Sequence, residues 1–275
     1  MHWFQVDLRR FGETLNLVRA AKPDYIFHLA GQAVPQEAWK DPEGTLQLNV
    51  GSTLFLLEAV CRFRPSARVL LASSSHVYGQ TFISHKRARE KDAAVPVNPY
   101  GGSKRLMELA ALNFVKAHGL DIMIVRAFNF IGTGQNPSYA FADFCRQVTL
   151  MERKRQPPVL HVGDIRVIRD FLHVSDGVRG YEILAEKGKT GGIYNLGSGK
   201  GLPLSEAVQL LRKITPVDFK VASMDSRFRK SDLPWIVSNP SKLRALGWRP
   251  RKSVLQGLHE ILNEWREKLP KGSKK

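Results

Sequence analysis

An apolar run at residues 68–73 constrains the fold of this chain more than any other feature. It is rich in Val and Leu at consecutive positions, which is typical of a strand buried on both faces. Similar runs occur at 24–29 and 121–126, and helical patterns at 46–63 and 101–118 separate the three. Strands that alternate with helices predict an α/β fold built on a doubly wound parallel sheet.

Turn-forming residues indicate where this first domain ends. Proline and glycine concentrate at 132–137 and again at 156–163, where we place the crossing into a second lobe. Further helical patterns cover 139–155, 205–214 and 253–268, and a short strand pattern covers 193–196. We predict three parts: a Rossmann-like domain at 1–133 to which 170–200 returns, a smaller C-terminal lobe at 134–169 and 201–268, and a basic tail at 269–275.

The composition argues against several functional classes. A net charge of +17 at pH 7 suggests nucleic acid as a partner, but the basic residues are scattered and no zinc spacing, helix-turn-helix signature or aromatic-basic motif accompanies them. We expect the charge to steer a pyrophosphate substrate or to reflect lineage. Cys61 and Cys145 lie in apolar helical patterns without metal-type spacing, which predicts reduced core residues and no metal. Without a membrane-length apolar run or a signal-peptide pattern, the chain is expected to be cytoplasmic and to have no membrane partner.

The segment from Asn98 to Lys104 places a phenol and an ammonium on one helix face. Of the six tyrosines, only Tyr100 has a lysine four residues later, and one turn of helix brings such positions together. A tyrosine whose pKa is about 10 exchanges protons poorly at pH 7, and a neighbouring lysine stabilises its phenolate. The motif alone fits an ordinary helix N-terminus equally well.

A cluster of serines follows the first apolar run. Residues 73–75 stand at the carboxyl end of the predicted strand, where parallel sheets bind their ligands. Strand, serine cluster and Tyr-x-x-x-Lys in this order resemble the catalytic set of the short-chain dehydrogenases/reductases. In the extended branch of that superfamily, the catalytic Ser or Thr lies four residues before a Tyr-Gly pair, which here is Tyr78–Gly79. The resemblance therefore implies three catalytic residues: Ser74, Tyr100 and Lys104.

Later segments resemble the same extended branch, which comprises nucleotide-sugar epimerases, dehydratases and reductases. They lie at 126–135, 156–163, 168–176 and 227–250, and the last most resembles the reductases and dehydratases of GDP-sugars. The similarity covers nearly the whole chain. It implies a Rossmann fold, NADP or NAD as cofactor, a nucleotide-sugar substrate with GDP favoured, and a homodimer.

One element of the family has no counterpart in this chain. The family begins with a strand, a Gly-x-x-Gly-x-x-Gly turn and a helix whose amino end holds the cofactor pyrophosphate. Residues 1–8 resemble the third strand of the fold instead, so a first β-α-β unit of roughly 40 residues is missing. A truncated sequence, a misplaced start codon and a genuinely short protein all agree with this. Without that unit, we expect exposed apolar faces near Ile26 and Leu70.

The resemblance also implies contacts with both ligands. Asp7 suits the adenine amino group, with a helix cap as an equal alternative, and Asn49 would brace the active-site strands or be a solvated helix residue. The guanidinium groups of Arg169 and Arg229 suit bidentate phosphate binding. Because the chain has 42 basic residues, ordinary surface charge is the alternative for both. His28 lies on an apolar strand and is expected in the core. Implied for the cofactor are Asp7, Leu29, Ala30, Gly31, Gln32, Asn49, Tyr100 and Lys104, and for the substrate Ser75, His76, Asn129, Leu160, Arg169, Arg229 and Asp232.

Two residues of this pattern favour reduction over dehydration. The dehydratases of the family carry Glu two positions before the Tyr-Gly pair, often after Asp, as acid and base for removing water. This chain has Ser75 and His76 there, and His76 is either an acid or, more simply, a polar loop contact. We expect NAD(P)H-dependent reduction of GDP-4-dehydro-6-deoxy-D-mannose to GDP-D-rhamnose. The alternatives are a 4-epimerase, a GDP-mannose 4,6-dehydratase, and a truncated nucleotide-sugar-binding protein without catalysis.

Overall fold

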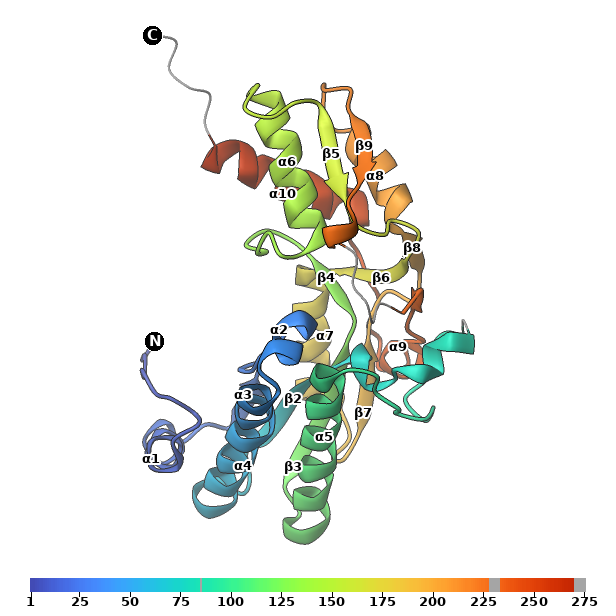
Figure 1. The fold of residues 1–275 in the computed structure, drawn as a ribbon. Coiled ribbons are helices and arrows are strands. Elements are labelled where there is room, and N and C mark those ends of the chain that lie inside the picture. Colours follow the sequence, from blue (N-terminus) through green and yellow to red (C-terminus); the bar gives the residue numbers. More distant parts are fainter. Residues whose placement is uncertain (85, 228–232, 270–275) are drawn as a thin grey trace. The chain divides into compact units, whose positions relative to one another are not determined.

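The computed structural model describes residues 1–84, 86–227 and 233–269 (Figure 1). These residues form two compact units, each with its own hydrophobic core. The first unit comprises 1–127, 179–196 and 238–248, and the second comprises 128–178, 197–237 and the chain from 249 onward. Apart from its first residue, the predicted basic tail lies outside the described residues.

The first unit is built on a parallel sheet of four strands. Their order is β1-β2-β3-β7, and every neighbouring pair is parallel. In the register, Leu70 of β2 pairs with Phe27 of β1 on one side and with Met123 of β3 on the other. The predicted parallel α/β fold is therefore confirmed. The strands are β1 (Tyr25–His28), β2 (Arg68–Ser74), β3 (Asp121–Ala127) and β7 (Ile193–Leu196).

Helices connect these parallel strands, as parallel pairing requires. Their apolar faces pack on the sheet through residues such as Leu57 and Met107, which are buried in one cluster with Val69 and Ile124. The elements are α1 (Phe11–Ala21), α2 (Pro35–Lys40), α3 (Pro42–Leu46), the π-helical η1 (Gln47–Gly51), α4 (Ser52–Phe63), the 3₁₀ turns η2 (Ser75–Val77) and η3 (Gln80–Ser84), α5 (Pro99–His118), α7 (Val174–Lys187), which begins in the second unit, and α9 (Ser241–Arg244).

Local sequence fixes both ends of α5. The Asn98 side chain caps the helix by accepting a hydrogen bond from Gly101 N at 2.8 Å, and Pro99 occupies the first helical position. At the other end, Gly119 takes the left-handed conformation with a φ of 67°. The predicted start of this helix at residue 101 was two residues late, because Pro99 and Tyr100 already belong to its first turn.

The second unit, within the described part of the chain, contains two smaller sheets and three longer helices. One sheet has the order β10-β6-β4, with β8 antiparallel to β6, and the other pairs β5 with β9. Phe141 and Phe144 of α6 pack in one core with Leu258 and Ile261 of α10. The elements are β4 (Asn129–Ile131), α6 (Ala140–Glu152), β5 (Val159–Val162), β6 (Ile168–His173), β8 (Gly201–Pro203), α8 (Leu204–Arg212), β9 (Lys220–Ser223), the 3₁₀ turn η4 (Asp225–Arg227), β10 (Trp235–Ile236) and α10 (Val254–Lys268).

Three expectations for the first unit were wrong in detail. Residues 1–7 form no strand, and within the described chain β1 pairs with β2 alone. Leu70 is fully buried, because α-helical side chains and both neighbouring strands cover β2, whereas Tyr25 and Phe27 of the edge strand are exposed. The helix predicted at 46–63 changes its winding at η1, so Asn49 lies in a π-helical turn.

We predict that His28 makes the first unit sensitive to acid. His28 is 5% exposed, with Nε2 3.0 Å from Thr53 Oγ1, and burial followed by the nearby Lys104 charge lowers its pKa to about 4. In the unfolded chain His28 binds a proton near pH 6.5. The contribution of the neutral His28 to the free energy of unfolding is therefore fully present above that pH and falls by about 3 kcal/mol towards pH 4.

The test compares urea unfolding of the wild type, His28→Gln and the exposed-site control His118→Gln at pH 6.5 and pH 4. The expected loss of unfolding free energy is smaller in His28→Gln and unchanged in His118→Gln. Equal losses in all three proteins would contradict the assignment.

Candidate active site

The three residues predicted to be catalytic lie together at the carboxyl end of β2. Lys104 Nζ donates to Ala72 O at 2.8 Å, two residues before Ser74 on the same strand. The Tyr100 ring packs edge-on against His76, two residues after Ser74, with ring centroids 5.4 Å apart. Tyr100 and Lys104 thus flank the strand end that carries Ser74, and α5 contacts both β2 and the following 3₁₀ turn.

Close packing at the start of α5 depends on one glycine. A Cβ on Gly101 would lie 2.5 Å from His76 O, which is closer than atoms can approach. Glycine therefore lets the helix start settle on the segment after Ser74. The sequence showed this residue within its motif, but nothing in the pattern indicated the contact.

Burial tunes the charge of Lys104. Its side chain is 5% exposed, and the loss of solvent lowers the pKa of its ammonium to about 8, while Glu108 acts in the opposite direction. At pH 7 most of the molecules therefore carry a charged Lys104. This charge beside Tyr100 is what a tyrosine needs to give up a proton near neutral pH.

Asn49 joins the loop after β1 to the catalytic helix. Its Oδ1 accepts from Gln32 N at 2.8 Å, and its Nδ2 donates to Gln32 O at 3.2 Å and to Ser103 Oγ at 2.9 Å. Ser103 Oγ in turn donates to Tyr100 O at 2.8 Å. Asn49 is 1% exposed, so it is not the solvated helix residue of the alternative interpretation.

The loop at 29–32 approaches the lysine closely. Gly31 has a φ of +153°, and a Cβ there would lie 2.6 Å from Asn49 Oδ1 and 3.5 Å from Lys104 Nζ. Glycine thus leaves room for backbone beside the ammonium. Leu29 is exposed at the same edge, and Gln32 lines a pocket of about 210 Å³ together with Arg9 and Leu48.

Asp7 makes contacts that differ from those of a helix cap. Its carboxylate accepts from Arg9 N at 3.0 Å and from the Arg9 guanidinium at 2.8 Å, and these bonds lower the pKa of Asp7 to about 2. The residue before α1 is Arg10, so the capping alternative for Asp7 was wrong. Its carboxylate is ionised and available to a further donor.

The contacts of His76 define its tautomer. Because Asn98 Oδ1 accepts from Gly101 N, Asn98 Nδ2 is the atom that faces His76 Nδ1 at 3.2 Å. An amide nitrogen only donates, so Nδ1 accepts and the ring proton is assigned to Nε2. In this tautomer the other ring nitrogen, Nε2, is a donor. Ser75 beside it is buried.

The predicted substrate residues of the second unit lie on separate strands. Asn129 on β4 donates from Nδ2 to Asp170 O at 3.2 Å, and Arg169 on β6 is 7% exposed and donates to Ile168 O at 2.9 Å. Leu160 on β5 is completely buried in the hydrophobic core of the second unit. Arg229 and Asp232 lie outside the described residues.

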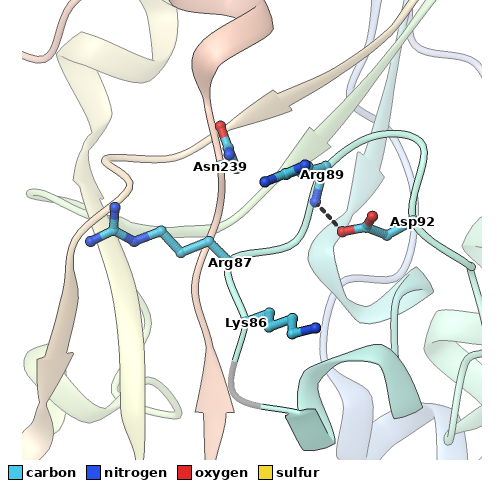
Figure 2. Close-up of a pocket in the computed structure, with 5 residues that line it drawn as sticks. All are labelled: Lys86, Arg87, Arg89, Asp92 and Asn239. Carbon is cyan, nitrogen blue, oxygen red and sulfur yellow. Dashed lines mark hydrogen bonds between the residues drawn. The ribbon is translucent and has the colours of Figure 1, made fainter.

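A basic pocket of about 510 Å³ lies elsewhere on the first unit and carries no assigned role. It is lined by Lys86, Arg87, Arg89, Asp92 and Asn239. Arg89 N donates to Asp92 Oδ2 at 2.7 Å, and Figure 2 shows Lys86 and Arg87 extending in opposite directions from the loop. These cations do not converge on one point, so the pocket is not a formed anion site.

Residues 1–84, 86–227 and 233–269 contain neither a cluster of metal-ligating side chains nor a membrane-spanning helix. Over these residues, His, Cys, Asp and Glu side chains form no group of three that could hold a metal ion. No helix in the described part of the chain combines the length and apolarity needed to cross a bilayer.

The sequence of this chain is similar to those of known nucleotide-sugar enzymes. The family model of GDP-mannose 4,6 dehydratase covers residues 1–261. GDP-6-deoxy-D-mannose reductase of Pseudomonas aeruginosa is 35% identical over 248 residues, which are 90% of this chain and 82% of the relative. dTDP-glucose 4,6-dehydratase of Streptomyces griseus is 30% identical over 260 residues, 92% of this chain and 77% of the relative.

Solved structures give the same result. RMD from Pseudomonas aeruginosa complexed with NADPH has a TM-score of 0.91 at 34% identity, covering 97% of this chain and 89% of its own. UDP-glucose 4-epimerase of Thermus thermophilus in complex with NAD has a TM-score of 0.85 at 27% identity, covering 97% and 85%. With the serine cluster, the Tyr-x-x-x-Lys helix and the parallel sheet in place, the chain belongs to the GDP-mannose 4,6-dehydratase family of extended short-chain dehydrogenases/reductases.

Proposed function

We propose that this protein uses NADPH or NADH to reduce GDP-4-dehydro-6-deoxy-D-mannose to GDP-D-rhamnose. The observation that carries the proposal is the contact of Lys104 with Ala72 and of Tyr100 with His76, the residues two before and two after Ser74, with a histidine where dehydratases have a carboxylate. The 35% identity to GDP-6-deoxy-D-mannose reductase supports the reaction, and the NADPH complex of RMD supports the cofactor.

The residues of the first unit fit two parts of a dinucleotide, its nicotinamide ribose and its adenine amino group. Gly31 leaves backbone exposed beside Lys104, and Gln32 and Asn49 hold that loop in place. When bound, the nicotinamide cofactor supplies the hydride. Lys104 and Tyr100 would hold the ribose of the cofactor, and Asp7 would accept a hydrogen bond from its adenine amino group. The backbone of the loop at 29–32 would lie against the cofactor.

The proton chemistry belongs to this chain. Reduction of the 4-keto group leaves negative charge on its oxygen, and Tyr100 would transfer its phenolic proton to that atom. The Lys104 ammonium, charged at pH 7 with a pKa of about 8, stabilises the phenolate that Tyr100 becomes. Ser74 would donate a hydrogen bond to the same substrate oxygen as charge develops there. The tyrosinate then regains a proton from solvent before the next turnover.

Stoichiometry separates this proposal from its alternatives. We expect one NADPH oxidised for each molecule of GDP-4-dehydro-6-deoxy-D-mannose consumed, followed by absorbance at 340 nm and chromatography of the sugar nucleotide. A 4-epimerase or a dehydratase returns the hydride and consumes no net cofactor. A product formed without NADPH loss would therefore contradict reductase activity, and a bound sugar without any product would leave a binding protein.

We predict that Tyr100→Phe lowers kcat by a factor of roughly 10² or more with little change in KM, because it removes the proton donor but keeps the ring against His76. Tyr139→Phe, in the exposed segment before α6, is the matched control and should retain full activity. Near-normal turnover in Tyr100→Phe would remove this residue from the mechanism.

We predict that GDP binds at least about tenfold more tightly than UDP, in calorimetric titrations whose affinity falls with added salt. Arg229→Ala should weaken GDP binding, whereas Arg166→Ala, an 83% exposed arginine paired with Asp164, should not. Equal affinities for GDP and UDP would refute the guanine assignment while leaving the reductase proposal open to its own test.

A homodimer in the cytoplasm stays a prediction.

A further inference from the structure

Glu108 extends the helix face that carries the catalytic pair. Tyr100, Lys104 and Glu108 follow one another at intervals of one turn along α5, and their exposed fractions are 7%, 5% and 0%. The sequence pattern showed a glutamate four residues after the lysine, but without its partners it resembled any helix carboxylate. Complete burial sets it apart, because a charged carboxylate inside a protein has to be paired.

Both oxygens of Glu108 accept hydrogen bonds from donors on three elements. Oε1 accepts from Ser73 Oγ at 2.6 Å and from Arg126 Nε at 2.9 Å. Oε2 accepts from Arg126 Nη2 at 2.7 Å and from Arg105 Nη1 at 3.0 Å. A carboxylate surrounded in this way by donors is ionised. It ties α5 to β2 at the residue next to Ser74, and to β3 at Arg126.

The charges around Lys104 come from few groups. On β2, the carbonyl of Ala72 accepts from Nζ, and on β1 the buried His28 is neutral at pH 7 because its pKa is about 4. Tyr100 and Glu108 share the face of α5, and burial alone would push the Lys104 pKa below its value of about 8. Of these groups, Glu108 carries the negative charge, and Arg105 and Arg126, which pair with it, carry positive charges.

We propose that Glu108 is a positioning residue for the proposed reduction: its carboxylate holds the Ser74 strand end against the catalytic helix and places a negative charge one helical turn from Lys104. Glu108 touches neither substrate nor cofactor in this proposal. It acts through Lys104, whose ammonium stabilises the phenolate of Tyr100, and through Ser73, whose backbone continues into Ser74. The predicted effect of Glu108 on catalysis rests on the proposed function, whereas its predicted effect on the charge of Lys104 does not.

The electrostatic part is tested on the protein without ligands. Lysine labelled with ¹³C at Cε is titrated by NMR, and the Lys104 signal is identified by its loss in Lys104→Met. Glu108→Gln should lower the Lys104 midpoint by about one pH unit or more, because the opposite charge is gone while the shape is kept. Glu58→Gln on α4, where the glutamate is an exposed partner of Arg62, is the matched control and should not move it. An unchanged midpoint in Glu108→Gln overturns the proposal.

A second variant keeps the proposal testable if Glu108→Gln does not fold. The double variant Glu108→Gln/Arg126→Met removes both charges of the buried pair, so that neither is left unpaired. Its Lys104 midpoint should still fall, although by less than in Glu108→Gln, because the charge of Arg126 opposes that of Glu108. A midpoint equal to that of the wild type overturns the proposal here too.

The catalytic part has its own readout. In Glu108→Gln, the alkaline decline of kcat/KM should move to lower pH by the same amount as the NMR midpoint, and Glu108→Asp should restore it. A decline that stays in place while the midpoint moves contradicts the link from Lys104 to Tyr100. If the reductase reaction itself is absent, the NMR titration still decides the electrostatic claim, so the two failures are distinguishable.

Discussion

The buried ion pair between Glu108 and Arg126 is the interaction on which the rest of the first unit depends. Arg126 is 2% exposed, donates to both oxygens of Glu108, and lies 4.6 Å over the ring of Tyr78. Tyr78 OH in turn donates to Asn195 Oδ1 on β7 at 2.7 Å. One network therefore joins the catalytic helix to β2, β3 and β7. Removing one partner of such a pair costs roughly 3–5 kcal/mol, since a buried charge is left alone.

The same network explains how the buried side chain of Lys104 keeps its positive charge at pH 7. Desolvation disfavours the ammonium of Lys104, and the nearby carboxylate offsets part of that cost, so the pKa of about 8 is a balance of the two. His28, which lies near the lysine without a carboxylate of its own, remains neutral down to a pKa of about 4. Two buried bases on neighbouring elements thus have different charges at pH 7, because burial lowers both pKa values from different ordinary values, 6.5 for His28 and 10.5 for Lys104.

Much of the fold was predictable from local sequence, and the limits have physical causes. The continuous apolar run at 68–73 predicted a central parallel strand, and the Tyr100–Lys104 spacing predicted the shared helix face, because both patterns repeat within a few residues. Two of the three residues that donate to Glu108, Arg126 and Ser73, lie 18 and 35 positions away, so no local pattern reveals them. Asn49, in the π-helical turn, likewise bonds to Gln32 and Ser103, which lie 17 and 54 positions away.

The most direct measurement of the central claim follows the hydride. GDP-4-dehydro-6-deoxy-D-mannose is incubated with NADPH carrying deuterium at the transferred position, and the product is analysed by NMR and mass spectrometry. If hydride reaches the carbonyl carbon, the product is GDP-D-rhamnose with one deuterium at C4. A sugar without deuterium at C4, or one labelled at another carbon, would contradict the account.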